Sequence, residues 1–67
     1  MKFQLKPEDH ERVSNLCGPT NSTLKQIEKE LKIKIINRGS QFKIDGDSYS
    51  EKLAKDIILK IYEDLEN

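Results

Sequence analysis

The sequence predicts a single two-layer α+β domain, residues 1–67, with a three-stranded sheet and three helices on one face of it. Three observations support this fold class. The 67 residues are enough for one small domain only. The apolar residues change from alternation to helical spacing and back along the chain. Glycine or proline stands at most of these changes.

The beginning of the chain predicts a strand and then a helix. Phe3 and Leu5 alternate with polar residues, as expected for a short strand over residues 3–5. Pro7 suits the first position of a helix, where its missing N–H costs nothing. We therefore expect a helix over residues 7–17, ended by Gly18, because glycine readily adopts the left-handed cap conformation.

A second helix is predicted directly after this glycine. Asn21, Ser22 and Thr23 are all credible N-caps, and Thr23 with Gln26 fits a capping box. Apolar residues then recur at helical spacing on one face. These residues are Leu24, Ile27 and Leu31.

The second half of the chain predicts a hairpin and a long helix. Branched residues over 33–36 and strict alternation over 41–45 indicate two strands, joined by a turn at residues 37–40. Gly46 ends the hairpin, and Ser48 with Glu51 fits a second capping box. The helix that follows has a wide apolar face suited to covering the sheet. It comprises Tyr49, Leu53, Ala54, Ile57, Ile58, Ile61, Tyr62 and Leu65.

Composition limits the function. The 12 basic and 12 acidic side chains cancel, but residues 1–38 carry a net charge of +3 and residues 39–67 a net charge of −3. Such a division is typical of a domain whose basic half binds a polyanion, or it is a chance feature of a charge-rich surface. No apolar run approaches the roughly 20 residues needed to span a membrane. One cysteine, Cys17, offers no disulfide, which favours a cytoplasmic protein in which Cys17 is a small core residue.

No motif indicates catalysis or metal binding. The chain is too short for both a core and a substrate pocket, so we expect no enzyme activity, no catalytic residue and no metal site. His10 is the only histidine, and its acidic neighbours in the first helix predict an exposed side chain.

The order strand, helix, helix, strand, strand, helix is that of a type I K-homology (KH) module. Gly18-Pro19-Thr20-Asn21 stands where such a module has its G-x-x-G loop. Further runs match the N-terminal domain of PhoH-like proteins, a phosphate starvation-inducible ATPase family. These runs are Leu16-Cys17-Gly18-Pro19, Gln26-Ile27-Glu28 and Asn37-Arg38-Gly39, followed by Phe42 and Gly46. The chain thus resembles that domain over residues 3–65.

The resemblance implies an RNA-binding module attached to an ATPase domain that uses ATP and Mg. The sequence contains no G-x-x-x-x-G-K-[ST] loop, so this chain carries no cofactor site of its own. By resemblance, its partners are RNA or another single-stranded nucleic acid and the ATPase domain of its parent protein. A homo-oligomer is left open, and no membrane partner is expected.

The candidate nucleic-acid-binding residues combine the loop with nearby cations. In order they are Gly18, Pro19, Thr20, Asn21, Lys25, Lys29, Lys34, Arg38 and Lys43. Lys25 and Lys29 are expected on one wall of a groove, and the three later cations on the hairpin as the opposite wall. Ile27 and Ile35 could form its floor, but the core is the favoured place for both.

The loop also departs from the KH pattern. Asn21 replaces the second glycine, and Pro19 lacks the N–H that such a loop can direct at a phosphate. Two functions therefore remain. The first is weak, sequence-tolerant RNA binding, favoured by the cations. The second is a protein-interaction or oligomerisation module, favoured by the altered loop.

Overall fold

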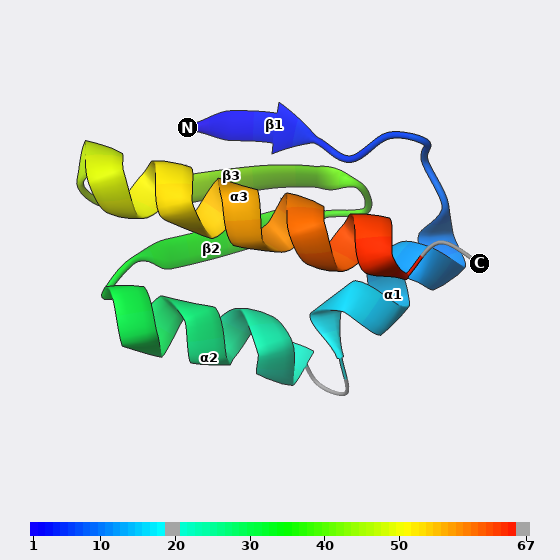
Figure 1. The fold of residues 1–67 in the computed structure, drawn as a ribbon, viewed down its shortest axis with the longest axis horizontal. Coiled ribbons are helices and arrows are strands. Elements are labelled where there is room, and N and C mark those ends of the chain that lie inside the picture. The colour runs from blue at the N-terminus through cyan, green and yellow to red at the C-terminus, as the bar shows by residue number, and fades with distance from the viewer. Residues whose placement is uncertain (19–20, 66–67) are drawn as a thin grey trace.

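The chain forms the predicted α+β fold, with helices on one side of a three-stranded antiparallel sheet. A computed structural model describes residues 1–18 and 21–65 (Figure 1). The order β-α-α-β-β-α is consistent with a KH-like topology. The elements are β1 (Lys2–Gln4), α1 (His10–Cys17), α2 (Ser22–Leu31), β2 (Lys34–Arg38), β3 (Gln41–Asp45) and α3 (Ser48–Asp64).

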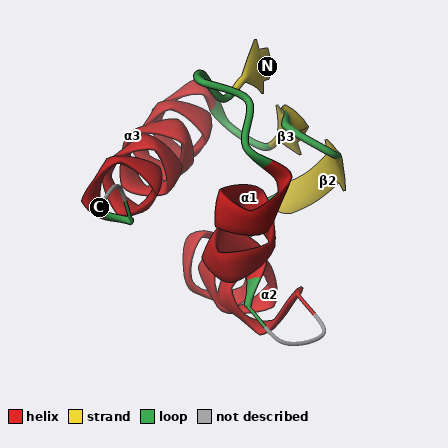
Figure 2. Ribbon diagram, turned by 90° about the vertical axis from the view of Figure 1, so that its right-hand side faces the viewer, coloured by secondary structure: helices red, strands yellow, loops and turns green. Residues whose placement is uncertain are grey.

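The sheet has the order β1-β3-β2, so β3 is central and the other two strands are edges. Phe3 lies opposite Phe42, and Ile35 lies opposite Ile44. These residues face the helices, whereas their neighbours along each strand are exposed on the other side. Figure 2 shows the sheet to the right and the helices to the left and below. The hydrophobic core therefore lies between one sheet face and the helices.

All three helices contribute to this core. Ala54, Ile58 and Tyr62 of α3 are buried, because they recur every four residues along one side of the helix. The other buried apolar residues come from every part of the chain. They are Leu5, Val13, Leu16, Cys17, Leu24, Ile27, Ile33, Phe42 and Ile44.

One residue of the predicted α3 face does not reach the core. Tyr49 is 75% exposed, so its assignment to the apolar face is wrong. It lies in the first turn of α3, where the helix extends beyond the buried part of its stripe. Tyr62 is buried as expected, and its hydroxyl donates to the Pro7 carbonyl oxygen.

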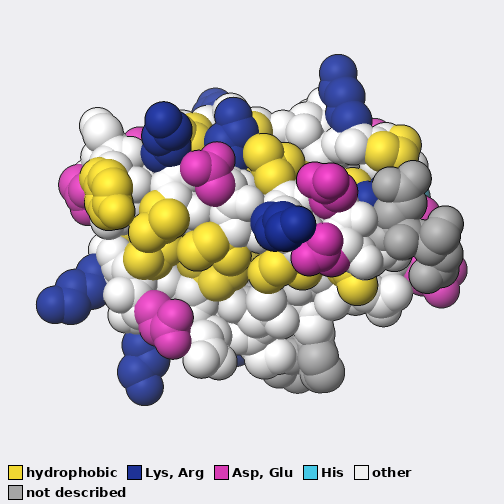
Figure 3. Space-filling model, in the orientation of Figure 1, with side chains coloured by type: hydrophobic (Ala, Val, Ile, Leu, Met, Phe, Trp, Pro, Cys, Tyr) yellow, Lys and Arg dark blue, Asp and Glu magenta, His cyan; other side chains and the backbone are white. Residues whose placement is uncertain are grey.

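The flank of α3 beside the core carries half-buried apolar side chains. Leu53, Ile57, Ile61 and Leu65 follow one another at intervals of four residues. Figure 3 shows the helix side of the molecule, where apolar side chains form a band broken by charged residues. No helix in the described ranges is long and apolar enough to cross a membrane.

The first helix begins later than predicted. It starts at His10, and Asp9 rather than Pro7 defines its N-terminus. The Asp9 carboxylate accepts a hydrogen bond from the Arg12 N–H at 3.1 Å, which satisfies one of the free donors of the first turn. Proline lacks a side-chain acceptor, so it cannot replace this cap.

Both predicted capping boxes are corrected as well. Asn21 is the N-cap of α2, and Thr23 lies inside the helix. Asp47 caps α3 and accepts from the Ser50 N–H at 3.1 Å. The Glu51 carboxylate instead accepts from the Gly46 N–H at 3.1 Å, which ties the start of α3 to the end of β3.

The hairpin turn is tighter than the sequence predicted. Asn37 and Arg38 continue β2, and only Gly39 and Ser40 form the turn. Gly39 has a φ of +58°, a conformation that two-residue hairpin turns require and glycine adopts readily. Ser40 is buried, and its carbonyl oxygen accepts from the Leu5 N–H at 2.9 Å. This contact fixes the turn against the chain that follows β1.

Candidate nucleic-acid interface

The turn between α1 and α2 begins and ends in the left-handed conformation. Gly18 has a φ of +76° and Asn21 a φ of +59°. A Cβ atom at position 18 would lie 2.8 Å from the Thr23 hydroxyl oxygen, so the site needs glycine for space as well as for backbone conformation. Asparagine tolerates the left-handed region better than most residues. Pro19 and Thr20 lie outside the described residues.

The turn presents the N-terminus of α2. The Asn21 N–H donates to the Gly18 carbonyl oxygen at 3.2 Å, which closes the turn. The Asn21 side chain makes no capping hydrogen bond, although it occupies the N-cap position. No side chain of the described residues caps the first turn of α2, so its N–H groups can bind an anion at the positive end of the helix.

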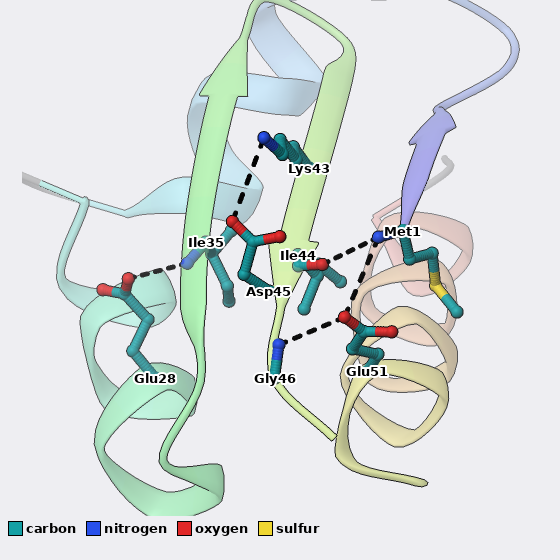
Figure 4. A network of polar contacts seen from close by, with 8 residues as sticks. All are labelled: Met1, Glu28, Ile35, Lys43, Ile44, Asp45, Gly46 and Glu51. Carbon is teal, nitrogen blue, oxygen red and sulfur yellow. Dashed lines mark hydrogen bonds and ion pairs between the residues drawn. The ribbon is translucent and has the colours of Figure 1, made fainter. Parts of the chain in front are cut away.

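The border between α2 and the free edge of β2 is the candidate cleft for a ligand. The Glu28 carboxylate on α2 accepts from the Ile35 N–H on β2 at 2.8 Å (Figure 4). At the other end of β2, the Asn37 side-chain amide lies 3.8 Å from the Cys17 sulfur at the end of α1. The two contacts show that β2 runs past α2 toward the α1–α2 turn. The cleft therefore ends at this turn.

Lys25 and Lys29 lie on the outer, solvent-facing side of α2, next to this border. An α-helix turns by about 100° per residue, so both lysines lie further around the helix than Glu28, on the side away from the buried Leu24 and Ile27. Both are exposed. Together with Ser22, Gln26 and Glu30 they line a shallow hollow of about 560 Å³. The outer side of α2 thus carries two exposed lysines close to the helix N-terminus.

The β2 wall offers backbone groups. The Ile35 N–H points to Glu28 and away from β3, so the N–H and C=O of Asn37, two residues on, also point to the free edge. The Asn37 backbone makes no hydrogen bond with the described residues on that side. An extended ligand in the cleft could bond to this edge.

The structure divides the predicted cations between two surfaces. Lys34, Arg38 and Lys43 alternate with inward-facing residues of the hairpin and are exposed on the sheet face opposite the helices. They therefore do not form the predicted wall facing Lys25 and Lys29. The strand period of two explains the difference, because Ile35 and Asn37 are the β2 residues that face α1 and α2.

The remaining sequence candidates have structural places. Ile27 is buried and Ile35 half-buried against the core, as favoured. Cys17 is buried, and desolvation raises the pKa of its thiol, which disfavours the reactive thiolate. His10 has an exposed side chain 3.6 Å from a Glu8 carboxylate oxygen.

Sequence reasoning missed two residues of the cleft. Glu28 places a carboxylate beside β2, and Asn37 joins β2 to α1. Helical phase alone places Glu28 at the margin of the apolar stripe, which is the one signal that could have revealed it. Asn37 was assigned to the turn because asparagine is common in turns, so its position on the strand became evident only from the pairing with β3.

No protein-family model matches the sequence. No solved structure gives a significant match to the chain. The case for a function therefore depends on the geometry of the cleft together with the residues of the sequence.

Proposed function

We propose that this domain binds single-stranded RNA in the cleft between α2 and β2. The observation that carries the proposal is the turn at Gly18 and Asn21, which leads directly into α2 and whose N-cap residue, Asn21, makes no side-chain capping hydrogen bond. A phosphate at this position receives backbone N–H donors and the positive end of the helix dipole. Lys25 and Lys29 extend the same attraction along α2.

The cleft supports weak and sequence-tolerant binding. Glu28 adds a negative charge between the two walls, which opposes a phosphate close to it. No aromatic side chain lines the described part of the α2 hollow, so base stacking contributes little there. We expect dissociation constants of about 10⁻⁴ to 10⁻⁶ M at physiological salt, as for binding dominated by phosphate contacts.

By its resemblance to PhoH-like proteins, the domain is a non-catalytic module that delivers RNA to an attached ATPase in the cytoplasm. The apolar band on α3 supports a protein contact of this kind. Its half-buried residues offer a surface that a neighbouring domain can cover. ATP and Mg would then bind that other domain.

Titration with a labelled five-nucleotide RNA tests the proposal, because a KH cleft holds about four nucleotides. Lys25→Ala and Lys29→Ala should each weaken binding and reduce the slope of log K against log salt by about 0.7. Lys52→Ala on the exposed side of α3 is the matched control and should leave the slope unchanged.

Equal losses in the control and the cleft variants would contradict the proposal, since they indicate diffuse attraction. Absence of binding at low salt would favour the second function, a protein-interaction module. Two observations support that alternative: Glu28 in the cleft repels phosphate, and the free β2 edge can accept an extended peptide.

A gain-of-function variant separates the two functions further. Pro19→Lys combined with Asn21→Gly adds a backbone donor, a cation and a glycine at a left-handed position. If the turn binds phosphate, affinity for the five-nucleotide RNA should rise about five- to tenfold at low salt. An unchanged affinity with an unchanged circular dichroism spectrum would favour the interaction module.

A further inference from the structure

The sheet face opposite the helices is open to solvent and basic. Strand alternation and exposure place five charged residues on this open sheet face: Lys2, Lys34, Arg38, Lys43 and Asp45. Four cations and one carboxylate give it a net charge of +3, although the whole chain is neutral. An excess of this size on one face of a small neutral domain attracts a polyanion.

Two of these cations oppose each other directly. Lys2 on β1 is the register partner of Lys43 on β3. Like charges at opposed positions of neighbouring strands destabilise a sheet. Asp45 compensates in part, because its carboxylate lies 4.0 Å from the Lys43 ammonium (Figure 4). An anion bound between the two lysines would remove the remaining repulsion.

The open sheet face is hollowed and adjoins the cleft. A depression of about 630 Å³ is lined by residues that include Lys2, Ile36, Arg38 and Lys43. Ile36 is 43% exposed between the cations. Arg38 ends β2 and follows Asn37, the residue in contact with α1, so it lies at the border between the open sheet face and the cleft. From β2 to β1 the sheet spans two strand spacings, about 10 Å.

We propose that the open sheet face is a second contact surface for single-stranded nucleic acid, which binds the same strand after it passes Arg38. This inference rests on the proposed function, in which the cleft holds the first nucleotides. Phosphates contact Lys43 and Lys2, and the nucleotide that lies between Arg38 and Lys43 packs on Ile36. A flexible strand fits better than a folded acidic protein, because the cations line a shallow hollow that begins at the edge of the cleft.

The experiment compares labelled single-stranded RNAs of 5 and 12 nucleotides. The double variant Lys2→Gln/Lys43→Gln removes the opposed pair, and Lys52→Gln/Lys60→Gln removes two exposed lysines of α3 as the control. We expect the first variant to weaken binding of the 12-mer about tenfold at low salt. Its salt slope should fall by about 1.4, corresponding to two lost phosphate contacts. Binding of the 5-mer should not change.

An unchanged 12-mer affinity would overturn the proposal, and so would an equal loss in the control or an equal loss for the 5-mer. Polyglutamate and unlabelled RNA of equal charge can also be compared as competitors for the labelled 12-mer. If polyglutamate displaces it as effectively as the RNA does, the proposal is overturned in favour of an acidic protein partner. Failure of the proposed function is a separate result, seen as 5-mer binding that does not respond to Lys25→Ala or Lys29→Ala. The two double variants replace exposed lysines and no core residue, so both should melt as cooperatively as the parent.

Discussion

Strands β1 and β3 carry two adjacent cross-strand pairs of opposite chemistry. Phe3 and Phe42 stack on the helix side, with ring centroids 5.6 Å apart and an angle of 16° between the rings. One residue away, Lys2 and Lys43 face each other on the open side. The first pair stabilises the sheet by burial and stacking, whereas the second opposes pairing. The same two strands therefore hold the fold together on one face and accept repulsion on the other.

This difference teaches that the two faces of the sheet have different roles. The helix side holds Phe42 and Ile44, which are 2% and 0% exposed, so their substitution changes stability. Side chains on the open sheet face have little to lose on substitution, because they are exposed in the folded state. The charges on the open sheet face therefore influence what this surface can bind more than they influence stability.

The largest expected effect comes from two isoleucines on opposite faces. Ile44→Ala removes a fully buried side chain, so the free energy of unfolding should fall by about 2–5 kcal/mol. Ile36→Ala, at a half-exposed position on the open sheet face, should lower it by less than about 1 kcal/mol. Urea denaturation followed by circular dichroism measures both. Similar losses in the two variants would mean that the open sheet face is also packed.

The stacked pair gives the second prediction. Phe3→Leu keeps an apolar side chain against Phe42 but removes the aromatic contact, and it also removes the ring under the Lys55 ammonium, which lies 5.7 Å from the ring centroid. The free energy of unfolding should fall by about 0.5–1.5 kcal/mol. Thermal melting provides the measurement. An unchanged melting temperature would show that the aromatic contacts of Phe3 add nothing to the apolar packing that leucine preserves.

Substitution of one of the opposed lysines should change stability by a smaller amount, and should increase it. Lys2→Glu converts repulsion with Lys43 into attraction, so the free energy of unfolding should rise by about 0.2–1 kcal/mol at low salt. The gain should shrink in 1 M salt, where charges on the surface are screened. If the open sheet face binds RNA, affinity for a 12-mer should fall in the same variant. A variant that becomes both more stable and a better RNA binder would break the comparison between the two faces.

The smallest effect concerns the loop after β3, which belongs to neither face. Hydrogen bonds to Ser50 lower the pKa of the exposed Asp47 carboxyl in the folded state. Its contribution to stability is therefore complete above the ordinary aspartate pKa, near 4, and is lost as the pH falls through the lower folded value.

Asp47→Asn keeps a good N-cap residue but cannot titrate. Melting curves between about pH 5 and pH 2 should therefore show a smaller decrease in melting temperature for the variant than for the parent. Identical decreases would show that other carboxylates account for the acid sensitivity.

Much of the fold could be predicted because its signals are local. Gly18 ended α1 as expected, and the alternation around Phe42 and Ile44 predicted β3 with its correct bounds. The helix starts were less predictable, because several residues near each start can cap. Asp9 and Asp47, rather than Pro7 and Ser48, define these starts, and the carboxylate of each accepts a hydrogen bond from an N–H of the first turn.

The candidate site could be predicted in part only. Its loop and its cations were evident as residue types, but their distribution over two surfaces depended on strand register. Lys43 lies opposite Lys2 because β1 pairs with β3, a contact between residues about forty positions apart. No local pattern contains that pairing.

The sequence by itself therefore determined the order of the elements, most residues of the core and the left-handed turn at Gly18, since each follows from the conformational preferences of a few neighbouring residues. Only the tertiary structure decided which cations share a surface, where Glu28 meets β2 and how the open sheet face became basic. The physical reason is that burial of one sheet face selects the register, and the register then places every alternate side chain on the face that remains in water.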